Sequence, residues 1–600
     1  MAWIEANSWV RAVLVALTLW AVGYTIYRLF NKGIAPNAKL QQFSRYGVAS
    51  ILSSVPIGVC NIDPIQLPVA VIGIVSLLWM VTYPLTFHLT NRKSSPDYDH
   101  QMDVAFGIYT FGYLTGLYIL LPRLSVVWAI VVAVLVIVAM VQWIYYFTCS
   151  NCLDASGMKM LQETHYNEII EFLKSYSPVA VVMIFILSVG GVGALVWVAS
   201  SEIEMTVMFT WWGLLITAAV TLFILVYVFK KHHGVFMRTG ICELYSQVKE
   251  YVENNNKYVS NMEQRIAKLA VRRRAEVETP HTILLVIGES ASRDFMSAYH
   301  SDLVEDTTPW LRAMAADREH CVLFPNAYSC DIQTVPVLEK ALTEYNQYDG
   351  GQFYTSCSIV DIAHKLGYRV HWYSNQGHLG AADTPITLVA ETSEVAKWTK
   401  QELGKAQYDE TLIDFLDEVD PTKNNLVVLH LKGSHFNYEN RFKETTRQWG
   451  EPGSHEQIVN YKNTLYYTDQ YLLKPAYEYA KKKLNLQAMV YFSDHADVPD
   501  RHRQPNFGNF RDTHIPLMIW MSDKYKAACP EVFRAIEKNR ERYWTNDLAY
   551  ELVCGVLDIE SENYKEENSI ASEKYKYDKG DLTAMSGRIK IADDPGERGW

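Results

Sequence analysis

The sequence predicts two structural parts: an N-terminal α-helical transmembrane bundle and a C-terminal α/β domain with a largely parallel sheet. Two observations predict this division. Long apolar runs dominate the chain up to about residue 230, and ordinary globular sequence follows them. Beyond residue 281, compact apolar runs of strand length alternate with helical stretches, which is the pattern of an α/β domain. A chain of 600 residues is also too long for a single domain.

The region 1–230 contains six runs close to the ~20 apolar residues that a helix needs to cross a bilayer. A shorter run, Tyr46–Cys60, contains Ser53, Ser54 and Pro56, so it could span the membrane, re-enter it or lie at its surface. About six transmembrane helices are therefore expected, with five or seven as alternatives. Ordinary core helices are a poor explanation for so many runs of membrane length. The six runs are Ser8–Phe30, Leu67–Leu89, Val104–Leu121, Ser125–Phe147, Pro178–Ser200 and Thr206–Phe229.

Cysteines and charges predict the orientation. Six cysteines follow residue 230, an even number that suits disulfides in an oxidising compartment. We therefore expect the C-terminal domain outside the cytoplasm, with at least one disulfide. Six spans then place the N-terminus outside as well and the basic loop at 32–45 inside, as the positive-inside rule requires, although Lys230 and Lys231 break it. The six cysteines are Cys242, Cys321, Cys330, Cys357, Cys529 and Cys554.

The soluble part divides further by composition. Residues 231–280 are polar and helical in pattern, which predicts bridging helices, and residues 281–563 hold the strand and helix alternation. Residues 564–600 are rich in charged residues and predict a weakly ordered tail. Helices are expected at Tyr408–Val419 and Ile458–Lys483. Strands are expected at Thr282–Ile287, Arg369–Tyr373, Asn425–Leu431, Gln487–Phe492 and Ile515–Met521.

Polar side chains end three of these strand-like runs. The runs close in Gly-Glu289, in Lys-Gly-Ser-His435 and in Ser-Asp494-His495. Ligands gather beyond the carboxyl ends of the strands of a parallel sheet, so we expect these side chains in one site. An isolated Asp-His pair could equally cap the next element. Together with Glu289 and His435, however, it makes a mixed oxygen and nitrogen site suited to zinc or manganese.

A threonine, Thr334, lies between the first and second of these runs. Val335 and Pro336 follow it like the first turn of a helix, and a hydroxyl there faces the positive end of the helix dipole. The alternative is that Thr334 is a helix N-cap, and both interpretations can hold together. A metal can lower the pKa of a hydroxyl and stabilise a phosphoryl group. The sequence therefore predicts a membrane-anchored metalloenzyme that acts on phosphate esters.

Several motifs resemble one family, the lipid A phosphoethanolamine transferases, in order and spacing. The resemblance extends over the membrane part and the catalytic part, and so over nearly the whole chain. The motifs are Ile287-Gly-Glu-Ser-Ala-Ser-Arg-Asp-Phe-Met-Ser-Ala-Tyr, Thr307-Thr-Pro-Trp-Leu, Trp372-Tyr-Ser-Asn-Gln376, His430-Leu-Lys-Gly-Ser-His435-Phe-Asn-Tyr and Phe492-Ser-Asp-His495. The family usually has glycine after the Asp-His pair, where this chain has Ala496-Asp497.

The resemblance implies a domain of alkaline-phosphatase or sulfatase-like fold in the periplasm, anchored in a bacterial inner membrane. It implies Zn²⁺, with Mn²⁺ as the other candidate, held by Glu289, Thr334, Asp494 and His495. Thr334 would be the nucleophile. His435 and His502 would contact the transferred phosphate or a second metal, although His514 lies close to His502 in sequence.

The implied reaction moves phosphoethanolamine from phosphatidylethanolamine to lipid A or the lipopolysaccharide core through a phospho-threonine-type intermediate. A glycerol-phosphate transferase of the same fold is an alternative, as are a phosphodiesterase and a non-catalytic membrane scaffold. A sulfatase would need a C/S-x-P-x-R motif, and the segment that begins at Cys330 lacks its proline and arginine. The net charge of −11 argues against a nucleic-acid partner.

Overall fold

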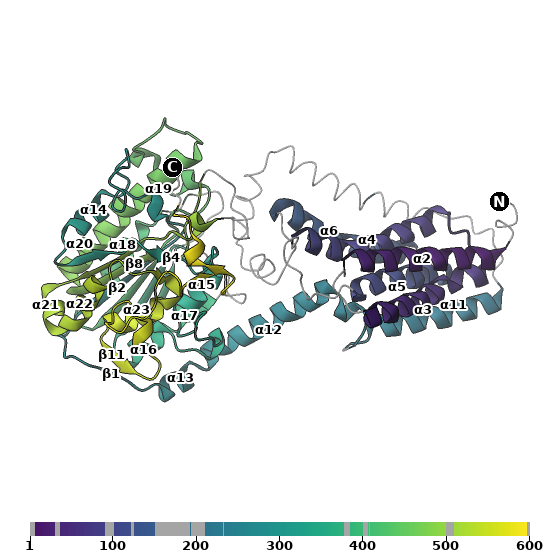
Figure 1. The fold of residues 1–600 in the computed structure, drawn as a ribbon, viewed down its shortest axis with the longest axis horizontal. Coiled ribbons are helices and arrows are strands. Elements are labelled where there is room, and N and C mark those ends of the chain that lie inside the picture. Colours follow the sequence, from purple (N-terminus) through teal and green to yellow (C-terminus); the bar gives the residue numbers. More distant parts are fainter. Residues whose placement is uncertain are drawn as a thin grey trace. The chain divides into compact units, whose positions relative to one another are not determined.

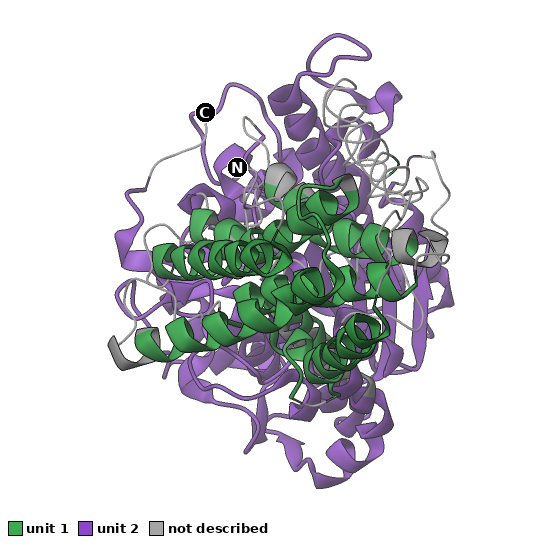
Figure 2. Cartoon of the chain, turned by 90° about the vertical axis from the view of Figure 1, so that its right-hand side faces the viewer, with its two compact units in different colours: residues 1–162, 172–250 green, residues 163–171, 251–600 purple. Residues whose placement is uncertain are grey.

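The computed structural model describes residues 7–30, 36–90, 101–121, 125–149, 210–231, 233–376, 385–399, 408–499 and 509–596, with the single residues 193 and 406. The chain forms two compact units, and Figure 2 distinguishes them by colour. The first comprises residues 1–162 and 172–250, and the second comprises residues 163–171 and 251–600. Figure 1 labels their elements.

The first unit is a bundle of long helices. Among the described residues, four stretches are long and apolar enough to cross a membrane: Ser8–Phe30, Pro68–Thr86, Gln101–Leu120 and Trp211–Phe229. A shorter apolar stretch, Ile130–Trp143, lies within α6. The predicted span Pro178–Ser200 lies outside the described residues. The helices are α2 (Ser8–Phe30), α3 (Pro36–Cys60), α4 (Leu67–Thr90), α5 (Gln101–Leu120), α6 (Ser125–Cys149) and α11 (Trp211–Phe229).

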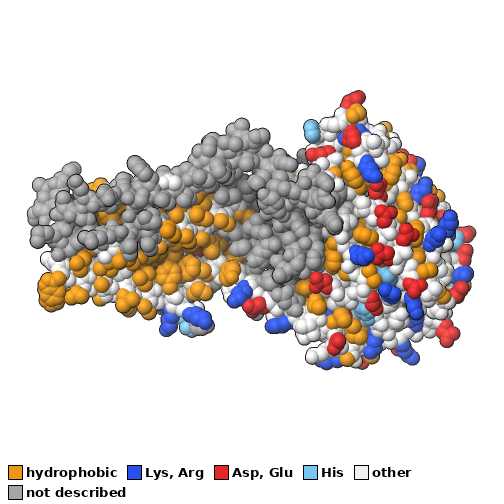
Figure 3. All heavy atoms as spheres, turned by 180° about the vertical axis from the view of Figure 1, so that it is seen from behind, with side chains coloured by type: hydrophobic (Ala, Val, Ile, Leu, Met, Phe, Trp, Pro, Cys, Tyr) orange, Lys and Arg blue, Asp and Glu red, His pale blue; other side chains and the backbone are white. Residues whose placement is uncertain are grey.

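Large apolar side chains on these helices point outward. Val13, Leu222 and Val226 are each more than half exposed, which would be costly in water. Figure 3 shows hydrophobic side chains gathered over the described part of the bundle, whereas charged side chains are scattered over the second unit. This surface fits a lipid environment, in agreement with the predicted transmembrane bundle.

The helices α2 and α11 begin at the same end of the bundle. There the first turn of α2 meets the last turn of α3, since a Cβ built on Gly58 would lie 2.8 Å from Trp9. The first turn of α11 lies at the same end, because a Cβ on Gly213 would lie 2.7 Å from the carbonyl oxygen of Val59. If these helices cross a membrane, the start of α2 and the end of α11 therefore lie on opposite sides of it.

The expected placement of both ends on one side does not fit these described helices, whereas the alternatives of five or seven passes would put the ends on opposite sides. The chain enters the bundle at one end and leaves it at the other, where the backbone N–H of Gly240 donates to Asp103 Oδ1 at the start of α5 (3.1 Å). The sequence did not decide whether the run Tyr46–Cys60 spans the membrane. In the structure it forms the second half of α3, a helix of 25 residues. Its serines are accommodated because Ser50, Ser53 and other small polar side chains are buried within the bundle.

Two helices and a short strand follow the bundle. They are α12 (Gly240–Ser260), α13 (Met262–Lys268) and β1 (Val271–Arg273). β1 pairs antiparallel with β11 (Ile559–Ser561), so the segment from residue 251, within α12, to β1 is built into the second unit. The boundary of the second unit thus falls at residue 251, earlier than the strand and helix alternation alone predicts.

A seven-stranded sheet is the centre of the second unit. The strand order is β3-β9-β8-β2-β7-β5-β6. The central pairs β8–β2, β2–β7, β7–β5 and β5–β6 are parallel, whereas β9 runs antiparallel to both its neighbours. The strands are β2 (Thr282–Gly288), β3 (Cys321–Leu323), β5 (Arg369–Ser374), β6 (Val395–Trp398), β7 (Asn425–His430), β8 (Leu486–Ser493) and β9 (Leu517–Met521).

Helices cover both faces of this sheet and make a three-layer α/β/α fold (Figure 1). Every residue of β2 is buried, and its side chains alternate between two apolar cores: Ile283 and Leu285 enter one, Leu284 and Val286 the other. The first core contains α15 (Thr334–Ala341), α16 (Ile359–Lys365), α17 (Pro385–Glu391), α21 (Asp523–Ala528), α22 (Pro530–Lys538) and α23 (Ala549–Val556). The second contains α14 (Pro309–Ala316), α18 (Thr411–Asp414), α19 (Gln457–Tyr467) and α20 (Lys474–Lys483).

The predicted fold class is confirmed. All five predicted strands are present, within two residues at each end. The sequence did not predict β3 or β6, which are only three and four residues long, nor the reversed direction of β9. The predicted helix 458–483 is interrupted by one π-helical turn, Thr468–Leu473, between α19 and α20.

The C-terminal segment is packed, and the predicted weakly ordered tail is wrong for residues 564–596. Its apolar residues stand singly among Lys, Glu and Asp, so composition alone concealed them. These apolar residues enter the same core as α15 and α23. They are Tyr564, Ile570, Tyr575, Tyr577, Leu582 and Ile591. Near the end of the segment, Asp594 accepts a hydrogen bond from Tyr328 Oη (2.8 Å) and lies 2.9 Å from His514 Nε2.

Asp594→Asn should therefore destabilise the second unit in a pH-dependent way. Burial opposes the charge of Asp594, but hydrogen bonds from His514, Gly596 and Tyr328 outweigh it and lower its pKa to about 2. A carboxyl with a depressed folded-state pKa stabilises the fold above its unfolded pKa of about 3.9 and loses that contribution as pH falls toward 2. We expect the variant to be less stable by about 1–2 kcal/mol at pH 7, with only about a third of that difference left at pH 2.5.

Thermal unfolding of the full chain in detergent at the two pH values measures this difference. The exposed neighbour Asp593 offers a matched control, and Asp593→Asn should change little at either pH. An equal destabilisation by Asp594→Asn at pH 7 and pH 2.5 would contradict the charge-based explanation.

The predicted disulfide is also wrong. All six cysteines after residue 230 are free thiols in the structure, and all but Cys242 are buried. They pack as small apolar side chains, and Cys321 lies in the core on the opposite face of the sheet from Cys330, Cys357, Cys529 and Cys554.

Candidate functional site

The sheet itself brings Glu289 and Asp494 together. Glu289 follows the last residue of β2 and Asp494 the last residue of β8. These strands are parallel neighbours, with Gly288 opposite Ser493 in the register. The residues that follow both strands therefore emerge side by side at the carboxyl edge of the sheet, as predicted. Both residues are buried, with at most 1% of their surface exposed.

A left-handed turn at Ser290 holds these carboxylates in place. Its φ of 57° is unusual for a residue with a side chain and costs free energy on the order of 1 kcal/mol. In this conformation the Ser290 N–H donates to Asp494 Oδ1 (2.9 Å) and its hydroxyl donates to Glu289 Oε1 (2.8 Å). Tyr461 Oη donates to the Ser290 carbonyl oxygen (2.7 Å) and so fixes the turn from α19.

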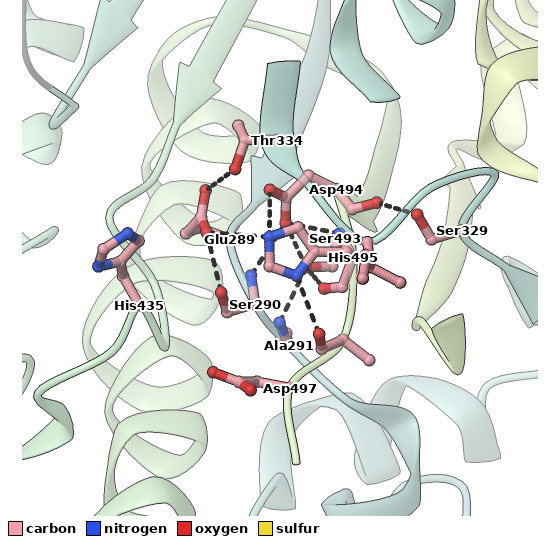
Figure 4. A network of polar contacts seen from close by, with 12 residues as sticks. Glu289, Ser290, Ala291, Ser329, Thr334, His435, Ser493, Asp494, His495 and Asp497 are labelled. Carbon is pink, nitrogen blue, oxygen red and sulfur yellow. Dashed lines mark hydrogen bonds and ion pairs between the residues drawn. The ribbon is translucent and has the colours of Figure 1, made fainter. Parts of the chain in front are cut away.

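The ring of His495 presents Nε2 to the same two carboxylates (Figure 4). Nδ1 lies 2.9 Å from the carbonyl oxygen of Ala496, which can only accept, so Nδ1 carries the proton. In the neutral ring, Nε2 then carries a lone pair, and this nitrogen lies 3.4 Å from Glu289 Oε1 and 3.2 Å from Asp494 Oδ2. A carbonyl behind the ring is the usual way in which a metal-binding histidine is oriented.

Thr334 comes from the first turn of α15. The helix cap is Gln333, which has extended backbone angles, so Thr334 is the first helical residue. Its hydroxyl donates to Glu289 Oε2 (3.1 Å). The structure therefore removes the alternative that Thr334 is an N-cap, and it places this hydroxyl next to the carboxylate cluster at the positive end of a helix dipole.

The cluster fits a divalent cation. Ligand atoms of Glu289, Asp494 and His495 lie within 4.8 Å of one another. Asp494 Oδ2 accepts no hydrogen bond although it is buried, and the Nε2 lone pair of His495 faces it. Burial and the charge of Glu289 raise the pKa of Asp494 to about 7. A cation among these lone pairs would offset their repulsion, and the Thr334 hydroxyl beside Glu289 would bring the number of donors to the four that zinc usually takes.

His435 lies in the loop that follows β7, the other neighbour of β2. The loop passes across the backbone of Glu289, since the Ser434 N–H donates to the Glu289 carbonyl oxygen (2.9 Å). Figure 4 draws the ring of His435 on the opposite side of Glu289 from His495. His502 lies outside the described residues.

The turn after the Asp-His pair contains Ala496 and Asp497, and hydrogen bonds from several side chains hold it. Asp497, at 3% exposure, accepts hydrogen bonds from Tyr438 Oη (2.9 Å) and from the Val498 N–H (2.8 Å). Ser329 and Asn546 donate to the carbonyl oxygen of Asp494 from behind. Side-chain hydrogen bonds thus fix the segment that starts with Asp494, and no glycine is needed there.

Comparison with known proteins agrees with this fold. Residues 281–554 match the family model described as sulfatase. This segment is a sulfatase-family domain. The chain is 24% identical to the phosphoethanolamine transferase EptC of Escherichia coli (strain K12) over 466 residues, which are 70% of this chain and 78% of that protein.

Two further matches cover different parts of the chain. The Kdo(2)-lipid A phosphoethanolamine 7''-transferase of Salmonella typhimurium (strain LT2) is 26% identical over 264 residues, 41% of this chain and 45% of that protein. The integral membrane lipooligosaccharide phosphoethanolamine transferase A (EptA) of Neisseria meningitidis matches in structure with a TM-score of 0.56 and 18% identity. That match covers 84% of this chain and 98% of the other, so the likeness in fold extends over residues of both units.

The sequence analysis did not predict the residues that support the site of the sulfatase domain through hydrogen bonds. Asp409 is buried and accepts hydrogen bonds from the Lys432 and Gly433 N–H groups (2.7 and 2.8 Å) and from Asn375 Nδ2 (2.8 Å). It thereby ties the loop after β7 to the end of β5. Gln376 donates to Glu289 Oε2 (3.3 Å). Asn375 and Gln376 close the motif Trp372-Tyr-Ser-Asn-Gln376 at the end of a predicted strand, so the sequence offered both the motif and this position as signals.

Gly433 allows the loop to pass close to Glu289, which gives a testable prediction. Its φ is 50°, and a Cβ there would lie 2.6 Å from the Glu289 carbonyl oxygen. Gly433→Ala should therefore displace Glu289 and weaken divalent-metal binding about 10-fold or more, because small shifts of a ligand's support typically cost 10–100-fold. Competition with a fluorescent chelator measures the affinity.

Gly453 is a matched control for this substitution. Its φ is 75°, but a Cβ there would meet nothing within 4 Å. Gly453→Ala should lower stability by about 1 kcal/mol through backbone strain and leave metal affinity unchanged. Equal metal affinity in the Gly433 and Gly453 variants would show that the close approach does not position Glu289.

Proposed function

We propose that this chain is a metal-dependent phosphoethanolamine transferase. The observation that carries the proposal is the hydroxyl of Thr334 at the start of α15, which donates a hydrogen bond to Glu289. Ligand atoms of Glu289, Asp494 and His495 lie within 4.8 Å of one another. A hydroxyl beside a candidate metal site at a helix N-terminus suits attack on a phosphate ester. Sequence similarity to EptC and to a Kdo(2)-lipid A phosphoethanolamine transferase supports phosphoethanolamine as the transferred group.

The proposed donor is phosphatidylethanolamine, and the proposed acceptor is lipid A or the lipopolysaccharide core. A bundle with an apolar outer surface supports this pairing, since donor and acceptor are both membrane lipids. We place the protein in a bacterial inner membrane with the sulfatase domain in the periplasm, where the acceptor is accessible. Because the start of α2 and the end of α11 lie at opposite ends of the bundle, the N-terminal end of α2 is then on the cytoplasmic side.

In this proposal Glu289, Thr334, Asp494 and His495 hold Zn²⁺, which would act as a Lewis acid toward the Thr334 hydroxyl and the phosphoryl oxygens. Thr334 Oγ1 attacks the phosphorus of the donor and its proton passes to water, while the bond from phosphorus to the diacylglycerol oxygen breaks. The diacylglycerol oxygen takes up a proton as it departs, and phosphoethanolamine stays on Thr334.

The second step reverses the roles of the oxygens. A hydroxyl or phosphate oxygen of the acceptor attacks the phosphorus, any proton on that oxygen passes to water, and the bond to Thr334 Oγ1 breaks as Oγ1 takes up a proton from water to restore the threonine. Dividing one displacement into two in this way is the usual benefit of a covalent intermediate. His435 and His502 are proposed to contact the transferred phosphate or a second metal.

Mass spectrometry of lipid A and core oligosaccharide tests this function. Cells that express the wild-type chain should carry lipid species heavier by one phosphoethanolamine unit than cells without the gene. Cells that express Thr334→Ala at an equal level are the matched control and should lack these species. Identical lipid profiles with and without the wild-type chain would overturn the proposed function.

A further inference from the structure

Two side chains next to Glu289 have no role in the proposed reaction. Lys432 is the second residue after β7, and Gln376 is the second after β5. These strands are parallel neighbours, with Ser374 opposite His430, so both side chains emerge at the same edge of the sheet as Glu289. Lys432 is only 5% exposed. A buried ammonium group is costly unless it is paired, so its contacts indicate what it does.

The contacts of Gln376 fix the orientation of its amide. Lys432 Nζ lies 3.3 Å from Gln376 Oε1, and an ammonium group can only donate. Gln376 Nε2 therefore points the other way, where it donates to the carbonyl oxygen of Leu431 (2.6 Å) and to Glu289 Oε2 (3.3 Å). All three contacts agree on the same orientation, because each pairs one donor with one acceptor.

The chain of contacts ends on the hydroxyl of Thr334. Glu289 Oε2 accepts from Gln376 Nε2 and also from Thr334 Oγ1 (3.1 Å). The other oxygen of Glu289 accepts from Ser290 (2.8 Å), so both carboxylate oxygens are held by donors. We propose that Lys432 is a positioning residue that acts through Gln376 to fix Glu289 Oε2, and with it the Thr334 hydroxyl, for metal binding. The catalytic part of this inference rests on the proposed function, whereas the part on metal binding does not.

The backbone of both loops is held independently of the Lys432 side chain. Asp409 accepts from the backbone N–H groups of Lys432 and Gly433 and from the side chain of Asn375. Replacement of the lysine side chain therefore leaves the loop anchored. Lys432→Met, which keeps an unbranched side chain of similar length but removes the donor, tests the contact with Gln376 without removing the support.

We expect Lys432→Met to bind zinc about 10-fold more weakly, in the range found for the loss of partners that orient metal ligands. The turnover number should fall about 10-fold or more, while KM for the donor lipid changes less than about 3-fold, because the affected group activates Thr334 rather than holding the lipid. Gln376→Leu should have the same effects. The double variant should be no worse than either single variant, since both remove the same chain of contacts.

Chelator competition on the purified full chain measures zinc affinity, and transfer to lipid A measures turnover. Lys462 is a matched control, because its side chain is 13% exposed and pairs with Glu305 (2.9 Å). Lys462→Met should leave zinc affinity unchanged. Wild-type zinc affinity in Lys432→Met, or losses that multiply in the double variant, would overturn the inference. Zinc binding without transfer by the wild type would instead refute the proposed function and leave the affinity test intact.

Discussion

Thr334→Ala is expected to reduce phosphoethanolamine transfer by about 10³-fold or more, because it removes the attacking oxygen itself. The side chain is the first of α15 and does not cap it, since the cap is Gln333. The variant should therefore keep the stability of wild type, and alanine even has a higher helix propensity than threonine. An N-cap threonine would instead cost about 1 kcal/mol on replacement by alanine and leave turnover unchanged.

Two measurements test whether Thr334 is the nucleophile or has another role. Incubation with donor lipid alone, followed by peptide mass spectrometry under trapping conditions, should show phosphoethanolamine on the peptide that contains Thr334. Thr334→Ser keeps an oxygen at this position and should retain part of the activity. Full turnover in the alanine variant, or an adduct on another residue, would contradict the assignment.

The sequence predicts the core of the sulfatase domain well because its strands are short and uniformly buried. Each residue of β2, β7 and β8 is buried, so each strand is a compact apolar run in the sequence. Polar residues directly after such runs can then be assigned to one edge of the sheet. That argument alone places Glu289, Asp494 and His495 together, and the register between Gly288 and Ser493 explains why it succeeds.

Other features depend on contacts that a sequence pattern does not contain. The direction of β9 is set by its pairing with β8 and β3. The direction in which α2 and α11 run through the bundle is known only from which helix ends lie in contact. The packing of the C-terminal segment depends on tyrosines that are far apart in the sequence but are buried in the same core. Asp409 and Gln376 support the site from loops distant in sequence, so their role emerges only when the loops lie side by side.

Asp494→Asn should stabilise the protein in a chelator and destabilise it relative to wild type in zinc. Burial and the charge of Glu289 raise the folded-state pKa of Asp494 to about 7, above the unfolded value of about 3.9. Without a metal, stability is therefore lost as pH rises from about 4 to 7, and at pH 8 the buried charge costs on the order of 1–3 kcal/mol. Asparagine removes that charge and its cost.

Asparagine also fits the hydrogen bonds at this position. Its Oδ1 can accept from the Ser290 and His495 N–H groups, as Asp494 Oδ1 does (2.9 and 2.7 Å). Its Nδ2 would take the place of Oδ2, 3.2 Å from the His495 Nε2 lone pair, and donate to it. The same substitution removes one anionic metal ligand, so zinc should bind more weakly and stabilise the variant less by mass action.

Thermal unfolding of both proteins at pH 5 and pH 8, in chelator and in zinc, measures this reversal. In chelator the variant should unfold at a higher temperature than wild type at pH 8, with a smaller difference at pH 5. In zinc the order should reverse. Asp469 is a matched control, because burial raises its pKa to about 6 and it lies away from the site, where it accepts from the Trp310 and Leu311 N–H groups. Asp469→Asn should leave the stabilisation by zinc as large as in wild type. A zinc-induced shift of wild-type size in Asp494→Asn would show that this carboxylate is not a metal ligand, since a ligand cannot lose its charge and keep its contribution to binding.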